Sequence, residues 1–430
     1  MSKIIFEPCK AIDPESGYAV NAGSDLAATF RFYKVYAGSI LHWLDEQYDY
    51  RLFFYSCETE DRLIYTYCYQ DEENWSAYCP EKSVHEWRNK SYTACEDGYI
   101  RVMVRKDNGN AYIEPTELDG ICELEVEDRE YVMPDYFQDE CKRVSDKVNS
   151  YSDNDNLKIL LLSDSHYVVN GTWEDTAHNI DRVMQNTNID MLVHLGDLTD
   201  GMTPLSVTKE YSLKIMDCLG GFGKPFYVCL GNHDSNYFKG NPELITEEEC
   251  AEFYLKNNKA YYYVDNDEYK LRMYFLYSFD QTQEIRYGFP KEEVDWLSDT
   301  LPGTPSGYKI IVFSHVPPLP QIHFWSDAIR NGDELIAVLE DYHTSHNNCV
   351  MAYVHGHNHA DQVYTGKMFP IIGVGCNKLE DFKDKKPDGS FTPDRKRNTV
   401  SQDLWDVMIV SAKENKIDFI RFGAGENRYV

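Results

Sequence analysis

Five apolar segments of the sequence end in aspartate, asparagine or histidine. The central one is the run 191–195, which is followed by Gly196 and Asp197. Short apolar runs bounded by turn residues predict buried strands. Open α/β sheets place their chemistry at the carboxyl ends of such strands. The donors, enough for two metal ions, are Asp164, His166, Asp197, Asn232, His315, His357 and His359.

A structural interpretation of the same residues also exists. A single Asp or His at the end of a strand usually caps it or completes a turn. Capping does not easily explain five strand ends in one chain that all carry oxygen or nitrogen donors. The pattern therefore favours a metal site.

The motifs resemble a known family. Asp-x-His, Gly-Asp-x-x-Asp, Gly-Asn-His-Asp, a lone His and Gly-His-x-His occur in this order and are similar to the calcineurin-like metallophosphoesterases over roughly residues 157 to 422. The resemblance implies an α/β fold in which a β-sandwich is flanked by helices (αββα). The implied function is hydrolysis of phosphoester bonds.

The resemblance also implies a role for each site residue. Asp197 would bridge two ions and His233 would act as an acid or charge stabiliser, with Asp234 holding the tautomer of its ring. One ion would be bound by Asp164, His166 and His359 besides Asp197, and the other by Asn232, His315 and His357 besides Asp197.

Phosphoester hydrolysis needs a nucleophile, neutralisation of the phosphate charge and help for the leaving group. Two nearby metals supply the first two, because water bridging them loses a proton near neutral pH. A carboxylate such as Asp197 can hold both ions. Oxygen and nitrogen donors without thiolate suit manganese, iron or zinc.

Two departures from related subclasses narrow the substrate. Asp200 stands where purple acid phosphatases carry a metal-binding Tyr, and Leu230 stands where protein serine/threonine phosphatases carry an Arg. The motifs are similar to the phosphodiesterase branch, so a phosphodiester is the favoured substrate. A small-molecule phosphomonoesterase and a non-catalytic scaffold on the same fold are the alternatives.

The formal net charge is -30 over 430 residues. Such a surface repels nucleic acid and anionic membranes, so we expect a small phosphoester as partner. The segment 377–400 is the most basic stretch, and a long loop inside a compact domain is often functional. It predicts a cationic rim for the substrate, or else a solvated insertion. The expected weak substrate contacts are Asp200, His323, Lys385, Lys386 and Arg395, and the remaining rim cations are Lys396 and Arg397.

The sequence predicts two domains. Residues 1–133 are rich in aromatics with period-2 alternation, including Phe30 and Phe32, and predict a small antiparallel β-sandwich. Its aromatics either fill the core or form a carbohydrate-binding or contact face. Residues 134–156 predict a connector helix and linker, and residues 157–430 a catalytic domain.

Targeting and redox signals are sparse. The N-terminus has no long apolar segment, and no stretch approaches the length of a transmembrane helix. The twelve cysteines include no CxxC pair and predict reduced thiols in a cytoplasmic protein. A disulfide within the set Cys57, Cys68, Cys79 and Cys95 is the alternative.

Overall fold

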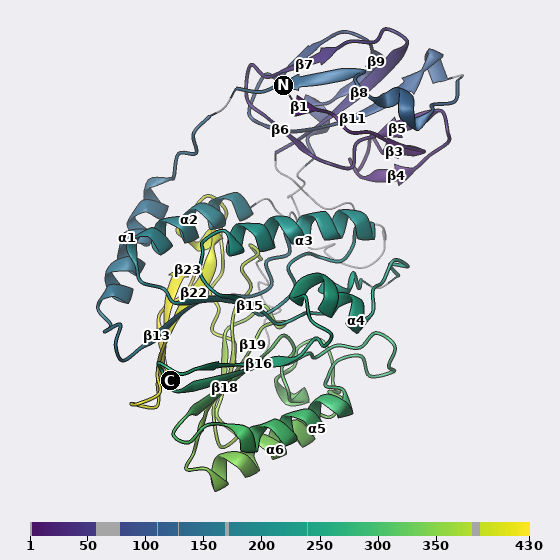
Figure 1. Cartoon of the computed structure of the whole chain (residues 1–430). Coiled ribbons are helices and arrows are strands. Elements are labelled where there is room, and N and C mark those ends of the chain that lie inside the picture. Colours follow the sequence, from purple (N-terminus) through teal and green to yellow (C-terminus); the bar gives the residue numbers. More distant parts are fainter. Residues whose placement is uncertain are drawn as a thin grey trace. The chain divides into compact units, whose positions relative to one another are not determined.

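The computed structural model describes residues 2–56, 78–109, 111–127, 129–167, 172–238, 240–380 and 388–430 (Figure 1). The chain forms two compact units, and the boundary between them in the sequence lies between Val132 and Met133.

The first unit is an antiparallel β-sandwich, as the sequence predicts. A four-stranded sheet has the order β1-β12-β7-β10, a six-stranded sheet has the order β2-β5-β11-β8-β9 with β6 also on β11, and β3 pairs with β4. The strands are β1 (Ser2–Lys3), β2 (Glu7–Pro8), β3 (Lys10–Ile12), β4 (Ala19–Asn21), β5 (Leu26–Ala28), β6 (Tyr33–Val35), β7 (Ile40–Trp43), β8 (Tyr48–Tyr55), β9 (Val84–Arg88), β10 (Tyr92–Thr93), β11 (Gly98–Lys106) and β12 (Cys122–Glu125).

Aromatic residues of this unit lie largely in its core. Trp43 from one large sheet packs with Tyr50 and Phe54 from the other in a single buried cluster. The strand expected around Phe30 and Phe32 is not formed, because both residues lie between β5 and β6, where they are buried. Burial of the aromatics supports the core-filling alternative for these residues.

The second unit contains two six-stranded sheets. Their orders are β15-β14-β13-β22-β23-β24 and β16-β17-β18-β19-β21-β20. The strands of the first sheet are β13 (Leu157–Leu162), β14 (Met191–His194), β15 (Phe226–Val228), β22 (Leu404–Ser411), β23 (Lys416–Gly423) and β24 (Arg428–Tyr429). Those of the second are β16 (Tyr262–Asn266), β17 (Leu271–Phe275), β18 (Lys309–Ser314), β19 (Val350–His355), β20 (Gln362–Tyr364) and β21 (Ile371–Gly373).

The two sheets pack face to face with helices outside, which confirms the αββα prediction. Alternate residues of β18 show how this works: Ile311 and Phe313 enter the core between the sheets, whereas Ile310 and Val312 pack under the outer helices. A strand buried on both faces needs a continuous apolar run rather than alternation. Helices α1 to α3 lie along one side and α5 and α6 along the other (Figure 1). The helices are α1 (Asp135–Asn149), α2 (Trp173–Asn186), α3 (Leu205–Gly220), α4 (Glu247–Cys250), α5 (Lys291–Thr300) and α6 (Gly332–Ser345).

Helix α1, expected as part of a connector, packs as an integral part of the second unit. Its buried Phe137 contacts Phe422 of β23 with ring centroids 6.1 Å apart, and Cys141 contacts the carbonyl of Asn179 in α2. The apolar stripe predicted from the spacing of these residues is therefore used for packing against this sheet and helix rather than for spanning between units.

Cysteine and membrane predictions can be compared with the described residues only. Cys79 and Cys95 carry free thiols, and Cys57 and Cys68 lie outside the described residues. No described helix combines the length and the apolar character that crossing a bilayer requires.

Candidate metal centre

Polar side chains from the ends of five parallel strands converge in the second unit. Strands β13, β14 and β15 run parallel in one sheet, and β18 and β19 run parallel in the other. Parallel strands end at the same sheet edge, so the residues that follow them are brought together. Four groups of possible metal donors result among the described residues, and two of them include Asp197.

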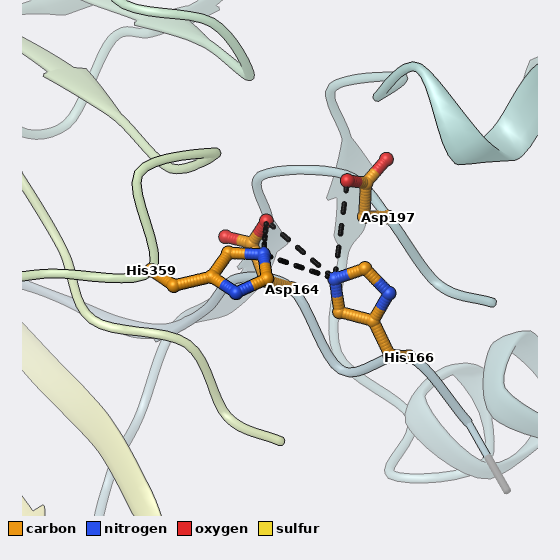
Figure 2. Close-up of side chains that lie close together, drawn as sticks. All are labelled: Asp164, His166, Asp197 and His359. Atoms are coloured by element: carbon orange, nitrogen blue, oxygen red, sulfur yellow. Dashed lines mark hydrogen bonds and ion pairs between the residues drawn. The ribbon is translucent and has the colours of Figure 1, made fainter. Parts of the chain in front are cut away.

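The first group comprises Asp164, His166, Asp197 and His359 (Figure 2). His359 Nε2 lies 3.3 Å from Asp164 Oδ1 and 3.1 Å from His166 Nε2. His166 Nε2 lies 4.0 Å from Asp197 Oδ2. A transition-metal ion holds such ligands at about 2.0–2.2 Å, which places neighbouring ligands roughly 3–4 Å apart. The spacing therefore fits one ion.

The second group comprises Asp197, His315 and His357. His315 Nε2 lies 3.0 Å from Asp197 Oδ2 and 3.1 Å from His357 Nδ1. Asn232, which follows β15, adds a buried side chain whose neighbour His233 donates its backbone N–H to Asp197 Oδ1 at 2.9 Å. Because Oδ1 is engaged in this way, Oδ2 is the Asp197 oxygen that faces both groups.

The hydrogen bonding of three oxygens at this site indicates whether the site suits a metal ion. Asp164 Oδ1, Asp197 Oδ2 and Asn232 Oδ1 are buried and have no hydrogen-bond partner among the described residues. A buried acceptor without a partner costs about 1–3 kcal/mol, and more when it is charged. Cations bound to these oxygens would remove that cost, so the donor set fits two metal ions.

The backbone at the site is held in an unusual conformation. Left-handed φ angles of 40–65° occur at five of the candidate ligands, which are Asp164, His166, Asp197, His357 and His359. Such angles cost about 1–3 kcal/mol each in residues other than glycine and cluster at functional sites. These turns therefore adopt costly backbone conformations that direct the side chains of the candidate ligands toward the site.

Two glycines permit the close approach of the loops. A Cβ at Gly231 would lie 2.1 Å from Asp197 Oδ1, and a Cβ at Gly356 would lie 1.9 Å from Ser163 Oγ. Any side chain at either position would displace a ligand-bearing loop. This accounts for the glycine that stands before Asn232 and for the one before His357.

The histidines are oriented from behind by oxygen acceptors. His166 Nδ1 lies 2.7 Å from Asp200 Oδ1, and His315 Nδ1 donates to the carbonyl of Leu195 at 2.8 Å. Each contact leaves the opposite ring nitrogen, Nε2, to face the site. Asp200, expected as a weak substrate contact, is thus a buried partner of His166.

Sequence reasoning missed Glu380. Its Oε2 lies 2.5 Å from His359 Nδ1, and Lys378 Nζ lies 3.5 Å from the same oxygen. Burial alone would raise the pKa of Glu380, but the charges of Lys378 and His359 outweigh it and lower the pKa to about 2. Only the position of Glu380 shortly after a predicted strand could have signalled this role.

The expected role of Asp234 needs correction. Its carboxylate accepts the backbone N–H groups of Asp197 and Gly231 at 2.8 Å and of Leu198 at 2.9 Å, instead of a proton from the His233 ring. Burial and the charge of Asp197 raise the pKa of Asp234 to about 7. Asp234 therefore shapes the loop that carries Asp197.

His233 itself faces the site. Its Nε2 lies 3.9 Å from Asp197 Oδ2, and its ring stacks on Phe238 at a centroid distance of 5.8 Å. The side chain is 17% exposed, unlike the nearly enclosed candidate ligands. A partly exposed imidazole beside Asp197 is placed to reach a bound substrate.

The other residues predicted as substrate contacts differ in where the structure places them. His323 packs against His357 with ring centroids 4.9 Å apart, and burial lowers its pKa to about 3. Arg395 is a correction, because its buried guanidinium donates to backbone carbonyls of the chain itself and cannot serve the rim. The acceptors are the carbonyls of Cys376, Asn377, Lys378, Ser401 and Gln402. Lys385 and Lys386 lie outside the described residues.

Electrostatics at the site reflect its carboxylates. Burial alone would lower the pKa of His315, but Asp197 and Asp164 raise it to about 9. For Asp164 the effect of burial is the opposite, because burial alone would raise the pKa of a carboxyl group. The positive charges of His359 and His315 more than offset burial, and the pKa of Asp164 lies well below its usual value. The carboxylates therefore create a potential that attracts cations.

Comparisons with known proteins agree with this site. A model of the family described as Calcineurin-like phosphoesterase matches residues 157–361. No curated protein matches the sequence.

Two solved structures illustrate the structural similarities. A dimetal phosphatase from Danio rerio is 14% identical, with a TM-score of 0.46, and the match covers 64% of this chain and 98% of the other. A purple acid phosphatase from yellow lupin (Lupinus luteus) seeds is 10% identical, with a TM-score of 0.40, and the match covers 95% of this chain and 72% of the other. The family match over residues 157–361 agrees with the resemblance to the calcineurin-like phosphoesterases that the ordered motifs indicate.

Proposed function

We propose that the protein is a dinuclear metal-dependent hydrolase of small phosphoesters, with a preference for phosphodiesters. The observation that carries the proposal is the arrangement around Asp197 Oδ2, where two groups of donors meet and buried oxygens have no partner in the described structure. Manganese, iron or zinc suits this mixture of oxygen and nitrogen donors.

Seven side chains would hold the two ions. The first ion would be held by Asp164, His166, Asp197 and His359, and the second by Asp197, Asn232, His315 and His357. When bound, two such ions supply an activated water and Lewis-acid neutralisation of the phosphoryl charge. The carboxylates of Asp200 and Glu380 keep two of the histidines facing inward.

His233 would serve the leaving group. Its ring is partly exposed, stacks on Phe238 and directs Nε2 toward the site. From this position a protonated Nε2 can donate to the oxygen of the departing ester group or stabilise its charge. Asp234 supports this step indirectly by holding the Asp197 loop.

The composition of the whole chain limits the substrates and partners that we expect. A net charge of -30 disfavours nucleic acid and anionic membranes, so the substrate is a small phosphoester. A cytoplasmic location follows from the sequence prediction of reduced cysteines, and a carbohydrate-binding or contact role of the first unit is a further prediction.

Metal analysis with a substrate panel tests the proposal. We expect about two transition-metal equivalents per chain after loading with Mn²⁺, and faster turnover of bis-p-nitrophenyl phosphate than of p-nitrophenyl phosphate. Fewer than one equivalent, without activation by added Mn²⁺, would instead support the non-catalytic scaffold. Preference for p-nitrophenyl phosphate would support the phosphomonoesterase.

A further inference from the structure

Trp325 is an exposed aromatic residue at the edge of the metal centre. It is 46% exposed, although its indole Nε1 donates to the carbonyl of His357 at 2.9 Å. Its ring centroid lies 6.3 Å from that of His359. The indole thus contacts the turn that carries two candidate ligands while a large part of it remains open to solvent.

The segment around Trp325 is fastened to this turn. Asn358, which is fully buried, donates from Nδ2 to the carbonyl of Ile322 at 2.6 Å and accepts the N–H of Phe324 at 3.1 Å. The backbone N–H of Trp325 in turn donates to His323 Nδ1 at 3.1 Å. A ring held in place before a ligand arrives loses little entropy on binding, so its contacts contribute fully to affinity.

Two of the described cations near the site are already engaged. Arg395 donates to five backbone carbonyls, and Lys378 is buried beside Glu380. The chain as a whole is strongly acidic. Neither of these two cations is available to a substrate, whereas the exposed ring of Trp325 offers a surface for apolar stacking.

We propose that Trp325 forms a stacking subsite for a flat aromatic ring on the ester substrate. The ring is either an aryl group or a nucleobase, since both present the same π face to an indole. This inference rests on the proposed phosphoesterase function and adds to it the class of substrate.

Substrates that differ only in the group that does not leave test the subsite. Methyl p-nitrophenyl phosphate, phenyl p-nitrophenyl phosphate and the p-nitrophenyl ester of thymidine 5'-monophosphate all release p-nitrophenolate. Hence differences in kcat/KM among them report on the spectator group. We expect the Mn²⁺-loaded wild-type protein to favour the two aromatic spectators over methyl.

Trp325→Ala should remove this preference. We expect kcat/KM for the aromatic esters to fall about 5- to 100-fold, the range for stacking on one aromatic side chain, mainly through KM. The methyl ester should change less than about twofold. Trp325→Phe should retain much of the preference, and Tyr429→Ala, which removes a 57% exposed aromatic on β24, should leave all three values unchanged.

Several outcomes would overturn the subsite. Equal loss for the methyl and phenyl esters, with metal content and melting temperature retained, would show that Trp325 acts on the site as a whole. If Trp325→Ala loses metal or stability, Trp325→Phe decides, and loss of the preference in a metal-loaded Trp325→Phe protein contradicts the proposal. Loss confined to the thymidine ester assigns the subsite to nucleobases, and loss for both aromatic esters assigns it to flat rings in general.

A binding measurement separates this inference from the proposed function. Phenylphosphonate and methylphosphonate can be titrated calorimetrically into the Mn²⁺-loaded protein, which requires no turnover. Tighter binding of phenylphosphonate that Trp325→Ala abolishes would support the subsite even in a protein that hydrolyses no ester. Equal binding of the two phosphonates by a wild-type protein that does hydrolyse phosphoesters would reject the subsite alone.

Discussion

Glu380 Oε2 and His359 Nδ1 lie 2.5 Å apart, although 21 positions separate the two residues in the sequence. The contact fixes which nitrogen of His359 faces Asp164, because Nδ1 is occupied. Lys378 partly compensates the charge of Glu380 from the other side. A loop outside the sequence motifs thus orients a candidate ligand.

Glu380→Gln should weaken the first ion specifically. Loss of an outer carboxylate partner typically lowers metal affinity about 10- to 100-fold. Titration of the metal-free protein with Mn²⁺ should therefore show one weakened step and one unchanged step. Glu414→Gln, on the exposed turn between β22 and β23, is the matched control. Two unchanged steps in the Glu380 variant would show that His359 needs no such support.

Asp197→Asn should disturb both ions. Its Oδ2 faces both groups of donors, and no other described carboxylate belongs to both. We expect metal analysis to give less than one equivalent per chain under conditions that load two in the wild type. Retention of two ions would show that Asp197 is not the bridge.

His233→Ala should keep the metals and lose turnover. The residue is absent from both ligand groups that contain Asp197, yet its Nε2 faces that carboxylate. Removal of a general acid costs about 10²–10⁴-fold in rate. Steady-state kinetics with parallel metal analysis measures this, and a variant that is empty of metal would assign His233 to the ligands instead.

Arg395→Met should destabilise the second unit. Five backbone carbonyls lose the bond from Arg395, and each buried carbonyl that is left without a donor costs about 1–3 kcal/mol. Relief by local rearrangement still leaves a loss of several kcal/mol, which lowers the melting temperature by about 5–15 °C for a domain of this size. Lys396→Met, at the exposed residue next to Arg395, is the control. Equal melting temperatures for the two variants would refute a structural role of Arg395.

Glu293→Gln should stabilise the protein at neutral and alkaline pH. Burial raises the pKa of Glu293 well above its usual value, and its Oε1 accepts the N–H of Tyr277 at 2.8 Å. The folded state therefore keeps a proton that the unfolded chain releases above about pH 4.3. Stability from this group is complete below that pH and declines as pH rises toward the folded pKa, by about 1.4 kcal/mol per pH unit.

A neutral glutamine has no such decline. In scans from pH 4 to pH 8, the melting temperature of Glu293→Gln should match the wild type near pH 4 and exceed it at higher pH. Scanning calorimetry over this range measures the difference. A constant difference at all pH values would show that Glu293 is ionised in the folded protein.

The sequence was sufficient to predict the catalytic fold and the set of residues that meet. Apolar runs such as 157–162 and 350–354 specify strands buried on both faces, and parallel strands must end at a common edge. For this reason the ordered motifs around Asp197 predicted a convergence that the structure shows. Asp200 and His166 were both named in advance, but the contact between them was not predicted.

Only the tertiary structure decided what surrounds those residues. Asp234 serves backbone N–H groups, Arg395 is buried, Glu380 supports His359, and Trp325 stands at the rim. Each of these depends on loops whose conformation is set by contacts between residues distant in sequence. One example is the hydrogen bond from the backbone N–H of Phe324 to Asn358 Oδ1. Hydrophobic periodicity records which face of a strand is buried, but it carries no information about which loop packs over a strand end. The convergence of the candidate ligands was therefore predictable from the sequence, whereas the residues that support them and the residues around the site were not.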